Sequence, residues 1–333
     1  MAGETMHAWQ VGRTGEPGDV LERVQRPVPE PGEGEALVRV AAAGLGLPDV
    51  FMCRGTYAFS PPRPFVPGQE MCGTVVAAGA DCDLAVGQRV MGVTAFYNGH
   101  GGLAEYCIAP DFSLYPVPDE MEDTEAAAFT IPCHTAWVGL VLRAGLSAGE
   151  VLLVHGAAGG TGAAGIRLGL ALGADVIAVV GGAEKAATAR EAGAQHVIDH
   201  RGKDFVAAVL ELTGGRGADV VYDPVGGETF ERSVDCTASG GRLLAVGFAS
   251  GRWGAADSGR LVARNCAALG VYVGAHDHSE LLECHHRLCE LRAAGTLSPS
   301  PAQAVAFHEI GAALQRLGGR SVPGKLVADL NPE

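Results

Sequence analysis

A glycine-rich segment between two apolar runs constrains this chain more than any other feature. Residues 150–185 read EVLLVHGAAGGTGAAGIRLGLALGADVIAVVGGAEK. The apolar run at 151–154 predicts a strand buried on both faces, and the small residues at 156–162 predict a tight turn. The small, apolar segment at 162–172 predicts a helix, and Gly173 stands where a helix C-terminal cap belongs.

The turn and the helix after it suit an anionic ligand. A second strand is expected at 174–180, and strand–turn–helix–strand units of this size are typical of dinucleotide-binding proteins. The free N–H groups at the start of a helix, with the helix dipole, bind a pyrophosphate. The residues expected to contact it are Gly159, Gly160, Thr161 and Gly162. The fingerprint G-x-G-x-x-G has Ala157 in place of its first glycine, and the alternative is a turn that only packs a helix onto a sheet.

The end of the second strand indicates which dinucleotide binds. A site for NAD carries an acidic residue about 20 residues after the glycines, where it bonds the ribose hydroxyls. Here the strand ends in Val-Val-Gly-Gly, and no carboxylate comes before Glu184. Lys185 follows, within reach of a 2′-phosphate, so the sequence favours NADP(H). The alternative is that Lys185 is a solvated residue on the helix surface.

Composition limits the partners and the location of the protein. The 333 residues suffice for about two domains, and 47% hydrophobic with 19% charged residues excludes a disordered chain. A formal net charge of −14 argues against nucleic acid or an anionic membrane as partner. Nine cysteines without a C-x-x-C pair, no apolar leader and no uninterrupted apolar span indicate a soluble, cytoplasmic protein.

The segments on either side of the glycine-rich unit differ in character. Up to about residue 118, short β-rich runs alternate with Pro and Gly clusters, as in a compact, barrel-like domain. These runs are 36–42, 73–78, 89–93 and 104–109. From about residue 120, helices and strands alternate, beginning with a helical segment at 123–144 that Pro132 kinks or divides.

The number of strands in the second region predicts its fold. Besides the two strands of the glycine-rich unit, strands are expected at 196–199, 219–223, 242–248 and 268–273. Six strands separated by helices are the number found in a doubly wound nucleotide-binding sheet. An apolar run at 325–330 is expected to return to the first domain. The predicted domains are therefore a β-rich domain formed by 1–122 and 275–333, and an inserted α/β domain at 123–274.

Several segments together resemble the medium-chain dehydrogenase/reductase superfamily, within it the zinc-free quinone oxidoreductase and enoyl reductase branch. They are GLGLPDVFMCRGTY, PFVPGQEMCGTV, GGLAEY, HGAAGGTGAAG, EAGAQHVIDHR, GADVVYDPVGG and GGRLLAVGFASG. The resemblance covers nearly the whole chain. It implies a GroES-like catalytic domain, an inserted Rossmann domain with a doubly wound parallel sheet, and a homodimer joined through the Rossmann sheet edge.

The resemblance also implies roles for single residues. Tyr57 matches the tyrosine that enoyl thioester reductases use as proton donor, and the alternative is an aromatic residue that only lines the pocket. Thr135 matches a threonine near the nicotinamide; alternatively, it bonds its own helix backbone. Four further residues are expected to contact the cofactor. They are His200 and Arg201 beside the 2′-phosphate, and Gly247 and Phe248 at the nicotinamide half.

The positions of the zinc ligands in related alcohol dehydrogenases argue against a catalytic metal. They correspond here to Gly46, Gln69 and Ile131, and glycine and isoleucine offer no ligand. Two His/Cys-rich stretches remain, at 276–278 and 284–289. Their spacing permits a metal, but such residues more often decorate a helix and its approach, so we expect no metal.

These observations predict an NADPH-dependent, zinc-independent oxidoreductase that reduces a quinone or an α,β-unsaturated carbonyl compound, either an enone or an enoyl thioester. Asp49 matches the branch and is expected to bond backbone groups. Leu47 and Pro48 stand where many quinone reductases carry polar residues, beside Gly46 in place of an asparagine. This departure motivates the alternative of a catalytically silent NADPH-binding sensor or adaptor protein of the same fold.

Overall fold

The computed structural model describes residues 3–298 and 302–331, which form two compact units. Unit 1 comprises Met1–Ile131 with Pro301–Glu333, and unit 2 comprises Pro132–Ser300. The chain therefore leaves the first unit and returns to it, as expected from the apolar run near residue 325. The division differs from the predicted boundaries at 122 and 274, chiefly because the helix α10 (His278–Ala293) groups with unit 2.

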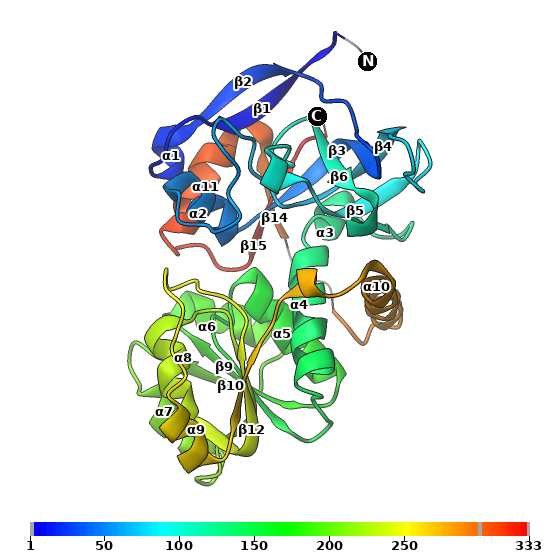
Figure 1. Ribbon diagram of the computed structural model, residues 1–333. Helices are drawn as coiled ribbons and strands as arrows, with labels where there is room; N and C mark the ends of the chain where they lie inside the picture. Colours follow the sequence, from blue (N-terminus) through cyan, green and yellow to red (C-terminus); the bar gives the residue numbers. More distant parts are fainter. Residues whose placement is uncertain (1–2, 299–301, 332–333) are drawn as a thin grey trace. The chain divides into compact units, whose positions relative to one another are not determined.

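Unit 1 is built on two sheets, seen at the top of Figure 1. Within the described residues, seven strands form the larger sheet in the order β14-β15-β3-β4-β5-β7, with β6 paired to β3. A separate antiparallel hairpin pairs β1 with β2. The strands are β1 (Thr5–Val11), β2 (Leu21–Pro27), β3 (Glu35–Leu45), β4 (Glu70–Ala78), β5 (Arg89–Val93), β6 (Tyr106–Pro110), β7 (Leu114–Pro116), β14 (Ala302–Ala306) and β15 (Lys325–Asp329).

Short helices complete unit 1 and close its apolar core. They are α1 (Pro17–Val20), α2 (Leu47–Arg54), η1 (Phe96–Asn98), η2 (Asp111–Ser113), α3 (Asp123–Ala126), η6 (Phe307–Glu309) and α11 (Ile310–Gly318), together with the start of α4 (Thr130–Trp137). Leu314 on α11 and Val50 on α2 are fully buried with Leu45 of β3 in one cluster. The C-terminal segment therefore shares one core with the N-terminal strands.

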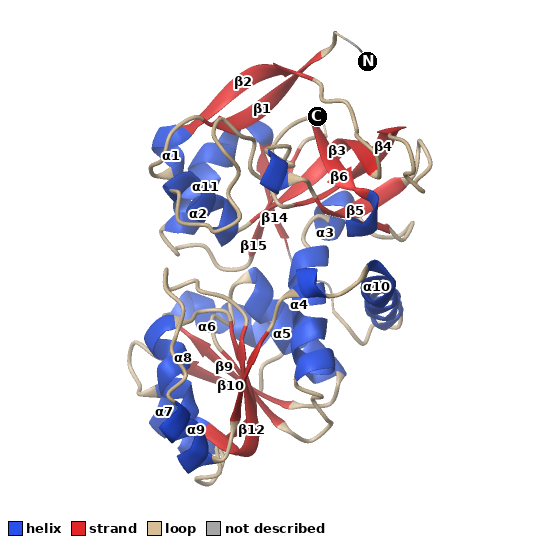
Figure 2. Cartoon of the chain, in the orientation of Figure 1, coloured by secondary structure: helices blue, strands red, loops and turns tan. Residues whose placement is uncertain are grey.

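Unit 2 is a parallel sheet with helices on both faces (Figure 2). Within the described part of the chain its order is β10-β9-β8-β11-β12-β13, which in chain order is 3-2-1-4-5-6, the order of a doubly wound dinucleotide-binding sheet. The strands are β8 (Val151–Val154), β9 (Asp175–Val180), β10 (His196–Asp199), β11 (Ala218–Asp223), β12 (Thr237–Ala245) and β13 (Ala267–Gly270).

The two faces of this sheet are covered by different helices. On one face, Phe205 and Phe230 pack with Ile177 and Leu243 in a single buried cluster. On the other face, helix α5 approaches closely, since a Cβ on Gly165 would lie 3.1 Å from the ring of Tyr222. The helices are η3 (Val138–Arg143), α5 (Gly160–Ala171), α6 (Ala183–Glu191), α7 (Phe205–Leu212), α8 (Gly227–Ser233), η4 (Val234–Cys236), α9 (Ser258–Arg264) and η5 (Val273–Ala275), besides α4 and α10.

Several element boundaries differ from the sequence-based expectation. The helical segment at 123–144, which Pro132 was expected to kink or divide, is divided into α3, α4 and the π-helical η3. The break between α3 and α4 lies before Pro132, which is inside α4. The fifth strand of unit 2 ends at Ala245, so Gly247 and Phe248 lie in the turn after it. Strands β1, β2, β7 and β14 were not predicted. None of the helices within residues 3–298 and 302–331 has the length and apolarity needed to cross a bilayer.

Candidate functional site

The glycine-rich turn joins β8 to α5 and leaves backbone open at the start of the helix. Gly159 is the N-cap of α5, followed by Gly160 and Thr161 in its first turn. A Cβ on Gly159 would meet only the Gly156 carbonyl oxygen, at 3.4 Å, so the space above it is open. A Cβ on Gly162 would lie 2.3 Å from the same oxygen. Gly159 thus leaves room for a ligand, and Gly162 permits the helix to pack against the turn.

The alanine in the fingerprint has a structural explanation. Gly156, one residue earlier, takes the left-handed conformation of this turn, with φ +56°. Ala157 is fully buried, and its N–H donates to the Val179 carbonyl at 3.3 Å. Because the glycine that the turn requires stands at position 156, alanine at 157 leaves the turn intact.

The predicted readers of the 2′-phosphate meet where β9 and β10 end. Asp199 on β10 is paired with Val180 on β9, so the turns that follow these strands lie side by side. A Cβ on Gly181 would lie 2.8 Å from His200 Nε2, and a Cβ on Gly182 would lie 3.1 Å from Arg201 Nη1. The two glycines therefore provide the space that the side chains of His200 and Arg201 fill.

Lys185 lies near this group, in the first turn of α6. That helix begins at Ala183 with Gly182 as its N-cap, and Lys185 is half-buried. Arg201 is exposed, and within the described residues it forms no ion pair. A cationic side chain and a helix N-terminus together suit a phosphate group.

The residues expected at the nicotinamide half lie on other elements of unit 2. The N–H of Gly247 donates to the Asp223 carbonyl at 3.3 Å, which brings the turn after β12 against the end of β11. The Phe248 ring is tilted against the Trp253 ring, with centroids 4.7 Å apart. Thr135 lies half-buried on α4. Gly247 and Phe248 thus follow the carboxyl end of a strand, where ligands bind such sheets.

Tyr57 belongs to unit 1 and is part of an aromatic cluster. It follows α2 and is half-buried. Its ring lies edge-on to Phe59 with centroids 5.8 Å apart, and tilted toward Phe96 with centroids 6.4 Å apart. Phe59 is 51% exposed, so the cluster presents an aromatic face at the surface of unit 1.

Asp49 lies near the start of α2 and connects two backbone segments, as expected. Its Oδ2 accepts from the Gly46 N–H and its Oδ1 from the Gly68 N–H, both at 2.9 Å. The side chain is buried. Burial raises the pKa of Asp49 to about 6, while the two N–H donors act in the opposite direction. Asp49 is therefore a structural residue that fixes the loop before β4.

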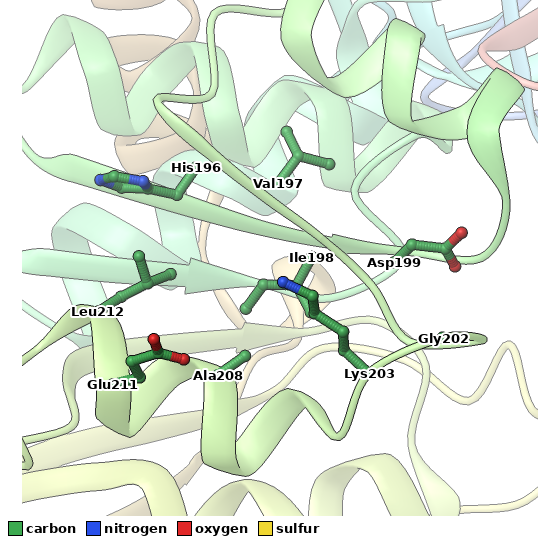
Figure 3. A pocket seen from close by; sticks show the side chains of 9 residues that line it. All are labelled: His196, Val197, Ile198, Asp199, Gly202, Lys203, Ala208, Glu211 and Leu212. Atoms are coloured by element: carbon green, nitrogen blue, oxygen red, sulfur yellow. The ribbon is translucent and has the colours of Figure 1, made fainter.

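A hollow of about 480 Å³ opens between β10, the following loop and α7. Figure 3 shows the side chains that line it, with Lys203 directed into the hollow near Ile198. Its lining mixes the charged Lys203 and Glu211 with apolar groups such as Leu212. The hollow borders the loop that carries His200 and Arg201, although neither lines it.

Both units of the chain contain segments that match models of known protein families. Residues 32–119 match the model for the alcohol dehydrogenase GroES-like domain, and residues 160–287 match the model for zinc-binding dehydrogenases. A quinone oxidoreductase-like protein 2 homolog from Nematostella vectensis is 35% identical over 302 residues, which span 89% of this chain and 82% of the relative. The chain belongs to the medium-chain dehydrogenase/reductase superfamily, in its quinone oxidoreductase-like branch.

Solved structures of the superfamily share the fold over almost the whole length. A quinone oxidoreductase from Pseudomonas syringae pv. Tomato DC3000 has a TM-score of 0.88 and 30% identity, covering 97% of this chain and 99% of its own. A mycobacterial protein solved in complex with NADPH has a TM-score of 0.88 and 33% identity, with the same coverage. The GroES-like and Rossmann parts expected from the sequence are thereby confirmed.

The positions that hold zinc in other members of the superfamily come together in unit 1 but do not fit a metal. Asp49 bridges Gly46 to Gly68, the neighbour of Gln69, and the Ile131 N–H donates to Glu70 Oε1 at 2.8 Å. Of the three corresponding residues, only Gln69 has a polar side chain, and its Nε2 faces the Met52 sulfur at 4.0 Å. The donor set that tetrahedral zinc requires is therefore lacking at these positions.

Residues of the two His/Cys-rich stretches cap helix α10 and form its packing contacts. His276 Nδ1 contacts Glu280 Oε2 at 2.6 Å, and Asp277 caps the helix by accepting from the Glu280 N–H. His285 is buried, with Nδ1 3.3 Å from His134 Nε2 and Nε2 3.5 Å from Cys289 Sγ. Among the residues the structure describes, no group of three or more His, Cys, Asp or Glu side chains is placed to hold a metal ion.

Sequence reasoning missed two carboxylates that shape the site. Asp199 Oδ1 accepts from the Gly182 N–H at 2.9 Å and from the Arg201 N–H at 3.0 Å. Asp223, at the end of β11, accepts from the Val225 N–H at 2.7 Å, and burial raises its pKa to about 6. Each aspartate is the last residue of a strand and is followed by a turn. An aspartate at the end of a predicted strand was therefore the signal in the sequence that could have identified both residues.

Proposed function

We propose that this protein is an NADPH-dependent, zinc-independent oxidoreductase that reduces a quinone or an α,β-unsaturated carbonyl compound by hydride transfer. One observation carries the cofactor half of this proposal. The turn after β9 ends in two glycines over which His200 and Arg201 lie, where a site for NAD would hold an acidic residue. The related mycobacterial structure with NADPH supports the same cofactor.

The glycine-rich turn suits the pyrophosphate of NADP(H). The backbone at Gly159 and the N–H groups at the start of α5 leave an open space that an anion can occupy, because no side chain stands over Gly159. We assign contacts with the phosphates to Gly159, Gly160, Thr161 and Gly162, and contacts with the 2′-phosphate to Lys185, His200 and Arg201. Thr135, Gly247 and Phe248 are assigned to the nicotinamide half.

Tyr57 is the proposed proton donor. When bound, NADPH supplies a hydride to the electron-poor carbon of the substrate. Reduction of an enone or enoyl thioester leaves negative charge on the carbonyl oxygen and requires a proton at the α-carbon. The phenol of Tyr57, neutral at pH 7, is suited to donate that proton.

The aromatic face around Tyr57 favours a flat, electron-poor substrate. Tyr57, Phe59 and Phe96 form contiguous ring contacts, and the Phe59 ring is half exposed. Aromatic faces attract flat rings through stacking as well as apolar contact. Quinones have this shape, and the relatives named quinone oxidoreductase support this substrate class. A quinone's reduced oxygens can also take protons from water, so that reaction does not need the Tyr57 phenol.

The first test is cofactor binding, measured by fluorescence titration of the full chain with NADPH and NADH. We expect tight NADPH binding that weakens selectively in Lys185→Ala. The control is Lys203→Ala, because Lys203 is directed into the neighbouring hollow (Figure 3). Equal binding of both dinucleotides would contradict the choice of NADP(H), and binding of neither would contradict the enzyme assignment.

The second test separates the two chemistries and the non-catalytic alternative. Tyr57→Phe is expected to lower turnover of an enone or enoyl thioester by about 10²–10⁴-fold and to leave quinone turnover near that of the wild type. Tyr106→Phe, which removes a phenol from β6 elsewhere in unit 1, is the matched control. NADPH binding without turnover of any quinone, enone or enoyl thioester would instead support a sensor or adaptor protein.

The sheet of unit 2 suits assembly of a homodimer through its edge. Strand β13 is an edge strand of the described sheet, and two apolar side chains in the segments before and after it are exposed, Val262 on α9 at 80% and Tyr272 at 58%. An open edge strand with nearby apolar groups favours pairing with another copy. Light scattering tests this, with Val262→Glu expected to produce monomer; a monomeric wild type would contradict it.

We also place the protein in the cytoplasm. None of the nine cysteines forms a disulfide in the described chain. Burial raises the pKa of five of these thiols, which are Cys53, Cys72, Cys107, Cys236 and Cys284. Free thiols persist in a reducing compartment. Fractionation of the native host tests the location, and recovery outside the cytoplasm would contradict it.

A further inference from the structure

One carboxylate oxygen joins the two turns that carry the proposed 2′-phosphate readers. Asp199 ends β10, and its Oδ1 accepts from the Gly182 N–H at 2.9 Å and the Arg201 N–H at 3.0 Å. The first donor belongs to the turn between β9 and α6, and the second to the turn between β10 and α7. Without this oxygen, strand pairing alone would align the two turns.

The alignment decides where the Arg201 guanidinium lies. A Cβ on Gly182 would be 3.1 Å from Arg201 Nη1, so the guanidinium passes directly over the backbone of that turn. Gly182 has φ +103°, a conformation that leaves its N–H directed at Asp199 and that other residues rarely adopt. The position of the cation therefore depends on a bond network centred on Asp199.

The carboxylate is engaged by the backbone and leaves the guanidinium available. Hydrogen bonds from the Gly182 and Arg201 N–H groups hold the pKa of Asp199 below its usual range, so it is ionised at neutral pH. Arg201 has no acidic partner within 4.0 Å among the residues the structure describes. Figure 3 shows the Asp199 side chain at the end of β10, among the residues that line the hollow.

We propose that Asp199 is a positioning residue for cofactor selectivity, which holds Arg201 over the Gly182 turn where the 2′-phosphate of NADPH binds. The inference rests on the proposed function, because it concerns the same cofactor site. It assigns no contact between Asp199 and the cofactor. Asp199 acts through Arg201, and its loss frees the guanidinium to move off the turn.

The test compares Kd values for NADPH and NADH in two variants of the full chain. Asp199→Ala removes the acceptor, and we expect NADPH binding to weaken about tenfold while NADH binding changes by less than about threefold. Asp199→Asn keeps an amide oxygen that accepts from both N–H groups, so we expect it to retain most of the selectivity. A general loss of stability would weaken the binding of both cofactors to the same extent.

A matched control and a double variant make the test sharper. Asp204 lies in the same segment, caps α7 by accepting from the Val206 N–H and pairs with Arg232. Asp204→Ala removes one carboxylate from this segment and is expected to leave the ratio of the two Kd values unchanged. In a cycle with Arg201→Ala, the effects of Asp199→Ala and Arg201→Ala on that ratio are expected to be far from additive.

The outcomes separate this inference from the function on which it rests. If the wild type prefers NADPH and Asp199→Ala keeps the same ratio of the two Kd values, the inference alone is overturned. Additive effects of the two substitutions overturn it as well, and so does an equal loss of affinity for NADPH and NADH. A wild type that binds neither dinucleotide overturns the proposed function and the inference together, and it is recognised before any variant is compared.

Discussion

Two charged residues, one in each unit, have opposite environments. In unit 1, Glu70 is buried on β4, where it pairs with Lys325 Nζ at 2.8 Å and accepts from the Ile131 N–H at 2.8 Å. In unit 2, Arg201 is exposed beside the end of β10 and pairs with no acidic side chain in the described chain. One charge is enclosed by the protein, and the other faces outward.

The difference separates charges that maintain the fold from charges that are available to a ligand. A buried carboxylate needs every partner that the structure provides, because an unpaired charge away from water is costly. An exposed cation costs little to keep and can neutralise an anionic ligand. We therefore expect a change at Glu70 to reduce stability with little effect on cofactor affinity, and a change at Arg201 to do the reverse.

The largest expected effect is in unit 1. Glu70→Ala leaves the Lys325 ammonium, which is 11% exposed, without its buried partner and leaves the Ile131 N–H unbonded. We expect the free energy of unfolding to fall by about 3–5 kcal/mol, measured by urea denaturation. The double variant Glu70→Leu with Lys325→Met removes both charges and should recover most of that loss. A double variant as unstable as Glu70→Ala would contradict the account.

A second, smaller effect tests the glycine-rich turn with two matched substitutions. In Gly162→Ala the new Cβ would meet the Gly156 carbonyl oxygen at 2.3 Å, and we expect a loss of about 1–3 kcal/mol in the free energy of unfolding. In Gly159→Ala the nearest atom is 3.4 Å away, so stability should stay near that of the wild type. NADPH affinity should nevertheless fall in Gly159→Ala, because the methyl group enters the space assigned to the pyrophosphate. Equal stability losses in both variants would argue against this division of roles.

The third effect is a pH dependence of stability. Burial lowers the pKa of His155 and of His134 from 6.5 to about 3, so both are neutral in the folded state at neutral pH. The unfolded chain takes up these protons below about pH 6.5, so stability is lost as pH falls from there toward 3. Each histidine contributes up to about 1.4 kcal/mol per pH unit in this window.

His155→Gln isolates one of these contributions. His155 Nε2 lies 2.8 Å from Ser233 Oγ, which also donates to the Thr229 carbonyl, so Ser233 keeps a partner in the variant. Unfolding free energies measured between pH 7.5 and pH 5 should depend less steeply on pH in the variant than in the wild type. An unchanged slope would mean that His155 is not the group that titrates.

The smallest effect on stability is expected at Arg201. Its side chain is exposed and forms no ion pair within the described residues, so Arg201→Ala should change the free energy of unfolding by less than about 0.5 kcal/mol. NADPH affinity should fall about tenfold in the same variant. A stability loss comparable with that of Glu70→Ala would remove the contrast between the two units.

Much of the architecture was predictable because local patterns and global fold agree. The strand–turn–helix–strand unit at 150–185 and the strands at 89–93 and 196–199 are found at or near the expected positions. Other strands have no signal of their own. Four of the seven residues of β2 are exposed, and the strand is held by its pairing with β1. Strand β14 buries only Val305 and is held by its parallel pairing with β15.

The site was predictable as a set of residue types but not as a geometry. The sequence shows that an acid is absent at Gly181 and Gly182, whereas only the structure shows that the space is filled by the side chains of His200 and Arg201. The role of Asp199 depends on the positive φ of Gly182 and on the pairing of β9 with β10, neither of which a linear pattern specifies. Such roles arise from backbone conformation rather than residue spacing.

The pairing of Glu70 with Lys325 also has a consequence for synthesis. The two residues are 255 positions apart, and ribosomes add about 5–20 residues per second, so Glu70 waits on the order of 10–50 s for its partner. During that time β3 also lacks β15, the strand that pairs with its residues 42–45, whereas β6 already pairs with its residues 35–39. Unit 2 occupies the contiguous stretch 132–300 and can complete its sheet meanwhile. A nascent chain halted before residue 325 therefore presents the open edge of β3 to chaperones, while its nucleotide-binding sheet is already complete.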